Sequence, residues 1–317
     1  MKIGIVEPKD FSKKVEDFLR SIGQVFMFDK SSEDLESFIS DKDVIFIRLE
    51  YFYSEQLLCY AKNLKYICSP TTGLNHIDLQ YVKDSNIQII SLKGEVDFLN
   101  QITATSEHTF GLVISLLRFY KRAFTEKNLT NLNRDLLKGY EINSSKIGII
   151  GLGRIGSHLV NYFNAFGAHI YYYDIDDSKE HLIAKKCSSI ESLIEASDVI
   201  ILSASYSSKN KKMIGRQRID MMKEKFFINT SRGELVDEEY LLDRIKEGFF
   251  SGVAIDVFNN EQGFLNNKEK IMQLTTLDLN FISTPHMGGA TLTSMAKTED
   301  FIAKKLELNI NQPELSL

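Results

Sequence analysis

Short apolar runs alternate with amphipathic stretches along almost the whole chain. Runs rich in β-branched and aromatic residues predict strands, and apolar positions three and four residues apart predict helices between them. In the N-terminal third, strands are predicted at Lys2–Val6, Val25–Phe28, Asp43–Arg48, Lys65–Cys68 and Ile87–Ser91, and helices at Lys13–Ile22 and Asp34–Ile39. Strands separated by helices favour parallel pairing, so this part predicts a small α/β domain. Ser31 and Asp34 have capping-box spacing, which predicts that Ser31 caps the second helix.

A long stretch at Thr103–Tyr120 has apolar residues on nearly every side. A helix of this kind is expected to be buried, and we interpret it as the crossover between two domains. The following segment, Lys121–Ser145, is polar and weakly patterned, and no element is predicted there.

The alternation begins again at Lys146. Strands are predicted at Lys146–Ile150, His169–Asp174, Asp198–Leu202, Phe226–Asn229, Gly252–Val257 and Phe281–Ser283, and helices at Arg154–Phe166, Ile190–Ala196, Glu238–Glu247 and Thr291–Leu308. Asp237 before the third of these helices and Gly248 after it are start and stop signals. We expect the last helix to return to the first domain. The predicted domains are therefore 1–99 plus 290–317, and 100–289.

Composition and charge exclude several classes of protein. Apolar content of 43% and charged content of 26% in 317 residues are ordinary for a globular protein, so disorder is not predicted. The net charge is −5, and no block of basic residues suits nucleic acid. The first residues are predicted to form a strand and not a signal peptide, because their apolar run is short. No run approaches the roughly 20 apolar residues that span a membrane. Three widely spaced cysteines suit a reducing compartment, which predicts a cytoplasmic protein without a metal site.

A glycine motif follows the strand Lys146–Ile150 directly. It reads Gly151-Leu152-Gly153-Arg154-Ile155-Gly156 and opens a helix, and the next strand ends at Asp174, 23 residues after the first glycine. This context is typical of a dinucleotide site, where glycines admit the pyrophosphate and an acidic residue binds the adenosine ribose. The charge of Asp174 would repel a 2′-phosphate, so NAD is predicted in preference to NADP.

Three residues suited to keto-acid reduction follow successive strands of the second domain. Arg232 can bind a carboxylate through its planar guanidinium, and His286 can exchange a proton near neutral pH. Glu261 can orient that histidine and stabilise its charged form. Carboxyl ends of parallel strands are where doubly wound sheets build their sites. His108 is interpreted as structural, as are three other histidines, while the role of His76 stays open.

On these motifs the chain resembles the D-isomer-specific 2-hydroxyacid dehydrogenase family over nearly its whole length. The matching segments are Gly151–Gly156 with Asp174, Asn229–Asp237, Asp256–Glu261, Thr284–His286, Thr72–Asp78 and Ala104–Thr109. The resemblance implies two doubly wound parallel-sheet α/β domains with a cleft between them. One is a Rossmann-type nucleotide domain, and the other is a smaller flavodoxin-like substrate domain.

The resemblance also implies a role for each matching residue. Arg232, Glu261 and His286 would be catalytic, and Gly73, Leu74, Arg232 and His286 would bind the substrate. The cofactor NAD would be bound by Gly151, Gly153, Arg154, Ile155, Gly156, Asp174, Ser203, Thr230, Asp256, His286 and Gly288. The implied activity is hydride transfer between NAD(H) and a small D-2-hydroxy acid or its 2-keto acid, in a homodimer.

The chain departs from the family pattern at three places. Ser203-Ala204-Ser205 stands where His-x-Pro is usual, Gln262 stands where a proline usually follows the acidic residue, and the stretch from there to Asn280 is longer. No regulatory domain of the kind found in some phosphoglycerate dehydrogenases is expected after the last helix.

Two other functions remain compatible with the sequence. One is a non-catalytic NAD(H)-binding sensor or corepressor on the same scaffold. The other is a relative that acts on a different group, such as an amino acid or a phosphite, although the loop Thr72–Asp78 argues against phosphite. Arg48 at a strand end could favour a phosphorylated substrate, but a structural arginine is the favoured interpretation.

Overall fold

The computed structural model describes residues 1–125, 134–259, 261 and 267–311. The chain divides into two compact units. The first contains Met1–Gln101 and Ala290–Leu317, and the second contains Ile102–Gly289. The sequence places the boundaries at 99/100 and 289/290, within two residues of these.

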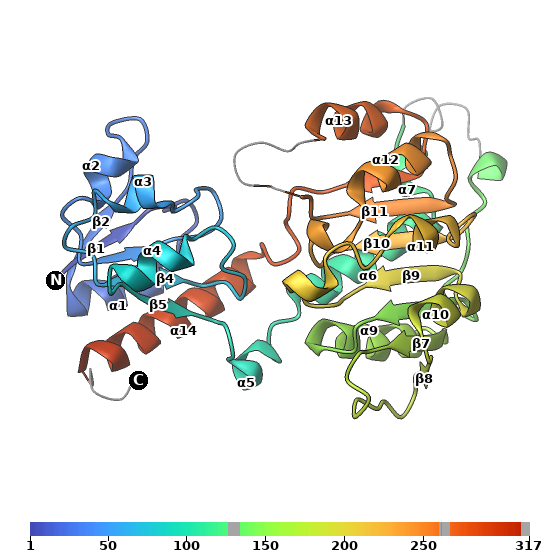
Figure 1. Ribbon diagram of the computed structural model, residues 1–317, viewed down its shortest axis with the longest axis horizontal. Helices are drawn as coiled ribbons and strands as arrows, with labels where there is room; N and C mark the ends of the chain where they lie inside the picture. Colours follow the sequence, from blue (N-terminus) through green and yellow to red (C-terminus); the bar gives the residue numbers. More distant parts are fainter. Residues whose placement is uncertain (126–133, 260, 262–266, 312–317) are drawn as a thin grey trace. The chain divides into compact units, whose positions relative to one another are not determined.

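The first unit is a five-stranded parallel sheet with the strand order β2-β1-β3-β4-β5 (Figure 1). Its elements are β1 (Lys2–Ile5), α1 (Lys13–Ile22), β2 (Gln24–Met27), α2 (Leu35–Ile39), β3 (Val44–Phe46), α3 (Glu55–Leu58), β4 (Tyr66–Ser69), α4 (Leu79–Asp84), β5 (Gln88–Ser91), α5 (Val96–Leu99) and α14 (Leu292–Asn311). The order is that of a flavodoxin-like sheet, as the resemblance implies.

Side chains of the first sheet alternate between two apolar cores, one on each face. Val44 and Phe46 of β3 pack with α1 and α14, whereas Ile45 and Ile47 pack with α2, α3 and α4. This alternation follows from the two-residue period of a strand. It explains why the strands are apolar at consecutive positions, since both faces of the sheet are covered by helices.

The second unit is a seven-stranded parallel sheet with the order β12-β11-β10-β9-β6-β7-β8. Its elements are α6 (Ala104–Leu117), α7 (Tyr120–Ala123), η1 (Arg134–Leu137), β6 (Lys146–Ile150), α9 (Arg154–Ala165), β7 (His169–Tyr173), β8 (Lys185–Lys186), α10 (Ile190–Ala196), β9 (Val199–Leu202), η2 (Ser208–Asn210), α11 (Arg216–Asp220), β10 (Phe226–Asn229), η3 (Gly233–Leu235), α12 (Glu238–Lys246), β11 (Gly252–Ile255), α13 (Lys268–Thr276) and β12 (Phe281–Ser283). The order reverses between β9 and β6, as in dinucleotide-binding sheets.

Helices cover both faces of the second sheet as well (Figure 1). The helices α6 and α9 pack on one face against Ile147, Ile149 and Ile228, while α10, α12 and α13 pack on the other against Phe227 and its neighbours. The predicted fold class, two doubly wound parallel-sheet α/β domains, is therefore confirmed.

Several local predictions were incomplete or wrong. Ser31 does not cap α2: the carboxylate of Asp34 accepts the N–H of Ser37 at 2.7 Å, while Ser31 bonds to Asp29. The helix predicted to reach Tyr120 ends at Leu117, because Phe119 adopts a left-handed backbone with φ 51°. The short elements α3, α4, α5, α7, α11 and β8, together with α13, were not predicted, because their segments show too little hydrophobic periodicity.

Candidate active site

The glycine turn between β6 and α9 has the geometry that a dinucleotide requires. Gly151 has φ 101°, and a Cβ on it would lie 2.7 Å from the backbone nitrogen of Ala204. A Cβ on Gly156 would lie 2.2 Å from the carbonyl oxygen of Gly151, so this glycine permits the close contact of helix and turn. At Gly153, by contrast, nothing lies within 4 Å of the Cβ position. A phosphate group can therefore approach the N–H groups in the first turn of α9, which have no partner within the helix.

Two charged side chains from the segment after β7 hold this turn. Asp174 accepts the N–H of Leu152 at 2.7 Å, and Lys179 donates to the Leu152 carbonyl oxygen at 3.0 Å. The second oxygen of Asp174 accepts the N–H of Asp176 at 3.0 Å. Asp174 is half-buried beside the turn, which is where an acidic residue meets the ribose hydroxyls in sites of this kind.

Ser203 lies next to the same turn. Its N–H donates to Ile150 at 2.8 Å, and its carbonyl carbon would lie 2.8 Å from a Cβ on Gly151. The Ser203 hydroxyl oxygen is buried and has no hydrogen-bond partner in the described part of the chain. The segment that stands where His-x-Pro is usual therefore packs its backbone against the glycine turn.

His286 and Glu261 form a hydrogen-bonded pair. The imidazole Nδ1 of His286 lies 2.5 Å from Oε2 of Glu261, and the other carboxylate oxygen accepts the N–H of Phe258 at 2.6 Å. His286 has a left-handed backbone, φ 52°, which its own N–H stabilises by donating to the carbonyl oxygen of Asp256 at 2.8 Å. Because Nδ1 is occupied, Nε2 is the nitrogen left to exchange a proton with a substrate.

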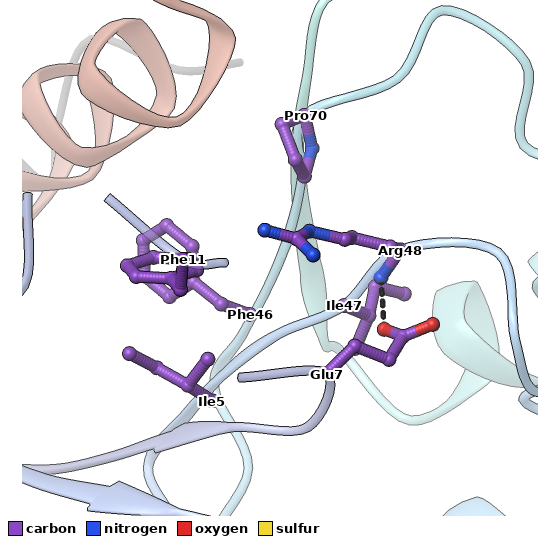
Figure 2. A pocket seen from close by; sticks show the side chains of 7 residues that line it. All are labelled: Ile5, Glu7, Phe11, Phe46, Ile47, Arg48 and Pro70. Atoms are coloured by element: carbon purple, nitrogen blue, oxygen red, sulfur yellow. Dashed lines mark hydrogen bonds between the residues drawn. The ribbon is translucent and has the colours of Figure 1, made fainter. Parts of the chain in front are cut away.

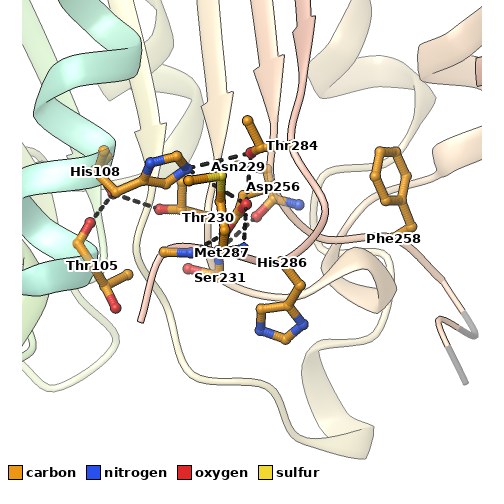
Figure 3. Close-up of polar contacts among 12 residues, drawn as sticks. Thr105, His108, Asn229, Thr230, Ser231, Asp256, Phe258, Thr284, His286 and Met287 are labelled. Atoms are coloured by element: carbon orange, nitrogen blue, oxygen red, sulfur yellow. Dashed lines mark hydrogen bonds and ion pairs between the residues drawn. The ribbon is translucent and has the colours of Figure 1, made fainter. Parts of the chain in front are cut away.

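Asp256 is the centre of a buried network behind His286 (Figure 3). Its carboxylate accepts the hydroxyl of Thr284 at 2.6 Å and the N–H groups of Met287 and Gly288 at 2.9 Å, and Nε2 of His108 lies 3.5 Å away. Burial raises the pKa of Asp256, but the hydrogen bonds outweigh it and bring that pKa below its ordinary value. The buried carboxylate is therefore ionised, and the hydrogen bonds that it accepts from Met287 and Gly288 fix the turn that carries His286.

His108, which is interpreted as structural from the sequence, belongs to this network. Figure 3 shows its ring reaching from α6 toward Thr284, whose hydroxyl lies 3.3 Å from Nε2. In the same view the ring of His286 points away from this group. The motif Ala104–Thr109 was the only sequence signal for His108, because its neighbours in the network are about 150 to 180 residues away along the chain.

Arg232 is presented by a turn that the buried side chain of Asn229 holds. The Asn229 amide donates to the carbonyl oxygen of Arg232 and accepts the N–H of Ser231, both at 3.0 Å. The hydroxyl of Thr230 meets that of Thr109 at 2.7 Å. The half-buried guanidinium of Arg232 donates to Ser231, and no carboxylate within the described ranges lies at ion-pair distance. An arginine in this state is available for an anionic ligand.

Gly233 brings the arginine segment against the segment that precedes Glu261. A Cβ on Gly233 would lie 2.2 Å from the carbonyl carbon of Phe258 and 2.4 Å from the nitrogen of Asn259. No hydrogen bond or ion pair joins Arg232 to His286 or Glu261 in the part of the chain that is described. The two segments are related by the pairing of β10 with β11 and by the packing at Gly233.

We expect Gly233→Ala to lower the free energy of unfolding by about 1–3 kcal/mol, because the new methyl group would meet backbone atoms that cannot rotate away. Thermal unfolding measures the effect. Gly111→Ala in α6 is the matched control, since nothing lies within 4 Å of its Cβ position. Equal melting temperatures for the two variants would contradict the proposed packing.

The candidate substrate residues Gly73 and Leu74 belong to the first unit, after β4. Their backbone N–H groups donate no hydrogen bond to the described residues, although both residues are half-buried. Thr71 donates to the carbonyl oxygen of Gly73 at 2.8 Å, which shapes the loop. The buried ring of His76 lies 3.2 Å from the Ser69 hydroxyl, so this histidine supports the same loop from inside.

The side chain of Arg48 makes its contacts within the first unit. Figure 2 shows it at a small pocket between Phe11, Phe46 and Pro70. One terminal nitrogen lies 2.5 Å from the fully buried carboxylate of Glu299 on α14, and the other donates to the carbonyl oxygen of Lys9 at 2.8 Å. These contacts support the structural interpretation of Arg48 and compensate the charge that a substrate phosphate would need.

Comparison with known proteins decides the family. The sequence model described as "D-isomer specific 2-hydroxyacid dehydrogenase, NAD binding domain" matches residues 110–288, more than half of the chain. The chain belongs to this family. The matched residues lie within the second unit. Because the model describes an NAD-binding domain, NAD is the cofactor, and the chain is an NAD-dependent 2-hydroxyacid dehydrogenase.

Three known proteins illustrate what the chain is similar to. The aromatic 2-oxoacid reductase of Clostridium sporogenes is 34% identical over 71% of this chain and 69% of its own length. The glyoxylate reductase of Thermofilum pendens is 29% identical over 87% and 80%. The Aquifex aeolicus D-lactate dehydrogenase, solved with NAD and lactic acid, has a TM-score of 0.81 and 27% identity over 98% and 96%. None of the three is named as a sensor or corepressor, and that alternative has no support.

Two further observations concern the environment and the chemistry of this family member. Among the described helices, none combines the length and the apolar composition that crossing a bilayer requires. Within the described ranges, no group of three or more histidine, cysteine or acidic side chains is arranged to hold a metal ion.

Proposed function

We propose that this dehydrogenase reduces a small 2-keto acid to the D-2-hydroxy acid with His286 as general acid, and catalyses the reverse reaction with His286 as base. The observation that carries this assignment is the 2.5 Å contact between His286 Nδ1 and Glu261, in the unit whose glycine turn fits NAD. A carboxylate at Nδ1 selects the tautomer and stabilises the imidazolium that donates from Nε2.

NADH, when bound, supplies the hydride that adds to C2 of the keto acid. The residues proposed to hold the cofactor are Gly151, Gly153, Arg154, Ile155, Gly156, Asp174, Ser203, Thr230, Asp256, His286 and Gly288. The open N-terminus of α9 suits the pyrophosphate. The unpaired hydroxyl of Ser203 and the half-buried carboxylate of Asp174 suit the polar groups of the dinucleotide.

The substrate carboxylate is assigned to Arg232, with the N–H groups of Gly73 and Leu74 as further donors. Arg232 has no carboxylate partner among the described residues, and the two N–H groups are likewise unused there. A guanidinium beside the reacting carbonyl also stabilises the negative charge that develops on its oxygen, so Arg232 acts in binding and in the chemical step.

The test of this function is the oxidation of NADH in the presence of a panel of 2-keto acids, with NADPH run in parallel. The panel contains glyoxylate, pyruvate, hydroxypyruvate, a 3-phospho-substrate, a branched keto acid and an aromatic keto acid. Turnover with NADH and any member supports the proposal and identifies the substrate class. Tight NADH binding without turnover of any member would contradict it.

We expect Asp174→Asn to reduce the preference for NADH over NADPH by about tenfold, measured as the ratio of dissociation constants. The amide keeps an oxygen for the N–H of Leu152, while it removes the charge that binds ribose hydroxyls and repels a 2′-phosphate. Asp135→Asn, at an exposed aspartate of η1, is the control. An unchanged ratio would show that Asp174 does not select the cofactor.

We also propose that the protein works as a homodimer in the cytoplasm. The family resemblance supports the dimer, and the three free cysteines suit a reducing compartment. Light scattering on the purified protein would measure the oligomeric state directly, and a monomeric mass would rule out the dimer.

A further inference from the structure

A second carboxylate lies close to the one that holds His286. Glu238 is the first residue of α12 and is only 5% exposed. One of its oxygens accepts the N–H of Asn259 at 2.7 Å, and the other accepts the side-chain amide of Asn267 at 2.8 Å. Glu238 therefore forms hydrogen bonds with Asn259, which precedes Glu261 in the sequence, and with Asn267, which follows it.

The two carboxylates bind neighbouring peptide groups. The N–H of Phe258 donates to Glu261, and the next N–H along the chain, that of Asn259, donates to Glu238. The Phe258–Asn259 peptide, which Glu238 binds, therefore directly follows the peptide whose N–H binds Glu261. Gly233 packs against the same peptide from the arginine segment.

Burial of Glu238 is costly, which argues that its position is specific. Burial raises the pKa of Glu238, the hydrogen bonds from Asn267 and Asn259 lower it, and the net shift is upward. The next residue, Glu239, is exposed on the same helix turn and needs no such partners. A buried carboxylate without its two donors would be unfavourable, so Glu238 and the segment around Glu261 stabilise each other.

We propose that Glu238 is a positioning residue of the proposed reaction: it holds the Phe258–Asn259 peptide so that Glu261 stays bonded to Nδ1 of His286. The inference rests on the proposed function of His286 and Glu261. It predicts that Glu238 acts on catalysis through Glu261 and makes no contribution of its own.

The variants are Glu238→Gln and Asn267→Ala, with Glu239→Gln as the matched control. Glutamine keeps the volume of the side chain but removes its charge and turns one acceptor into a donor, so the two charge-assisted hydrogen bonds are weakened. Asn267→Ala removes a single partner of Glu238 and leaves the buried carboxylate in place. It is the milder variant if Glu238→Gln fails to fold.

The first measurement does not require turnover. Amide hydrogen exchange at Phe258 and Asn259 is expected to accelerate in Glu238→Gln and Asn267→Ala but not in Glu239→Gln. NADH binding, followed by its fluorescence, is expected to stay within about twofold in all three, since Glu238 contacts none of the proposed cofactor residues. Unchanged exchange in both test variants would overturn the inference.

The second measurement uses a double-mutant cycle with Glu261→Gln. In the native background, Glu238→Gln is expected to lower kcat about 10- to 100-fold with little change in KM, because a displaced acid–base pair affects the chemical step. In the Glu261→Gln background the same substitution is expected to have almost no further effect. Equal losses in both backgrounds would mean that Glu238 is only a structural residue.

The outcomes separate the inference from the proposed function. A native protein that reduces a 2-keto acid, with a Glu238→Gln variant equally active, would retain the function and overturn the positioning role. A native protein without turnover would contradict the function, and hydrogen exchange alone would then decide whether Glu238 holds the peptide.

Discussion

His286→Asn is expected to lower kcat for 2-keto acid reduction by about 10²- to 10⁴-fold, because no other group would deliver the proton from the position of Nε2. Asparagine is preferred to alanine, since the backbone at this position has φ 52° and asparagine tolerates that region well. Steady-state kinetics at saturating NADH would measure the loss.

Binding measurements distinguish a catalytic role of His286 from a structural one. The dissociation constant of NADH is expected to rise by no more than about threefold, because His286 is one of many proposed cofactor contacts and the buried network of Asp256, Thr284 and His108 remains intact. His169→Gln, at an exposed histidine that opens β7, should leave all constants unchanged. A His286→Asn variant that keeps more than half of the native kcat would refute the general-acid assignment.

Arg232→Ala is expected to raise KM and to lower kcat together, with a loss in kcat/KM of about 10³-fold. The guanidinium binds the substrate carboxylate in the ground state and also stabilises charge in the transition state, so both constants respond. Arg232→Lys should recover only part of the loss, because an ammonium group lacks the planar pair of donors.

The substitution Arg232→Ala should affect substrate binding and turnover but not cofactor binding. NADH affinity is expected to remain unchanged, and Arg134→Ala, at an exposed arginine of η1, serves as the control for a lost positive charge. A kcat/KM within twofold of the native value in Arg232→Ala would show that another cation binds the carboxylate.

The two substitutions test different halves of the proposed chemistry. His286→Asn affects proton transfer and should spare KM, whereas Arg232→Ala affects both binding and rate. Gly233 lies between the two segments and packs on the peptide that precedes Glu261. A defect in both proton transfer and substrate binding after Gly233→Ala would therefore follow from displacement of both segments together.

The strands and the glycine turn could be predicted from sequence because their causes are local. Val44 to Ile47 are apolar at every position because both faces of the first sheet are covered. Gly151 has φ 101°, and a Cβ on Gly156 would lie 2.2 Å from the carbonyl oxygen of Gly151. Only glycine fits either position. Parallel strands end at one edge of a sheet, which is why Arg232, Glu261 and His286 could be grouped in advance.

The hydrogen-bond and ion-pair partners of polar side chains could not be predicted in the same way. Asp237 occupies the predicted N-cap position of α12, yet its carboxylate pairs with Lys212 at 3.1 Å and makes no cap hydrogen bond. Likewise Asp34 rather than Ser31 caps α2. A side-chain oxygen accepts from whichever donor the packed chain presents, and the spacing of residues does not reveal that donor.

The sequence by itself determined the two parallel-sheet units, the dinucleotide turn with Asp174 and the identity of the candidate triad. It did so because hydrophobic period, glycine sterics and strand ends are properties of short segments. Only the tertiary structure decided that His108 meets Asp256, that Arg48 is paired with Glu299, and that Glu238 holds the peptide before Glu261. Each of these contacts joins residues that are distant in the chain or oriented by packing, so their energies arise only when the chain has folded.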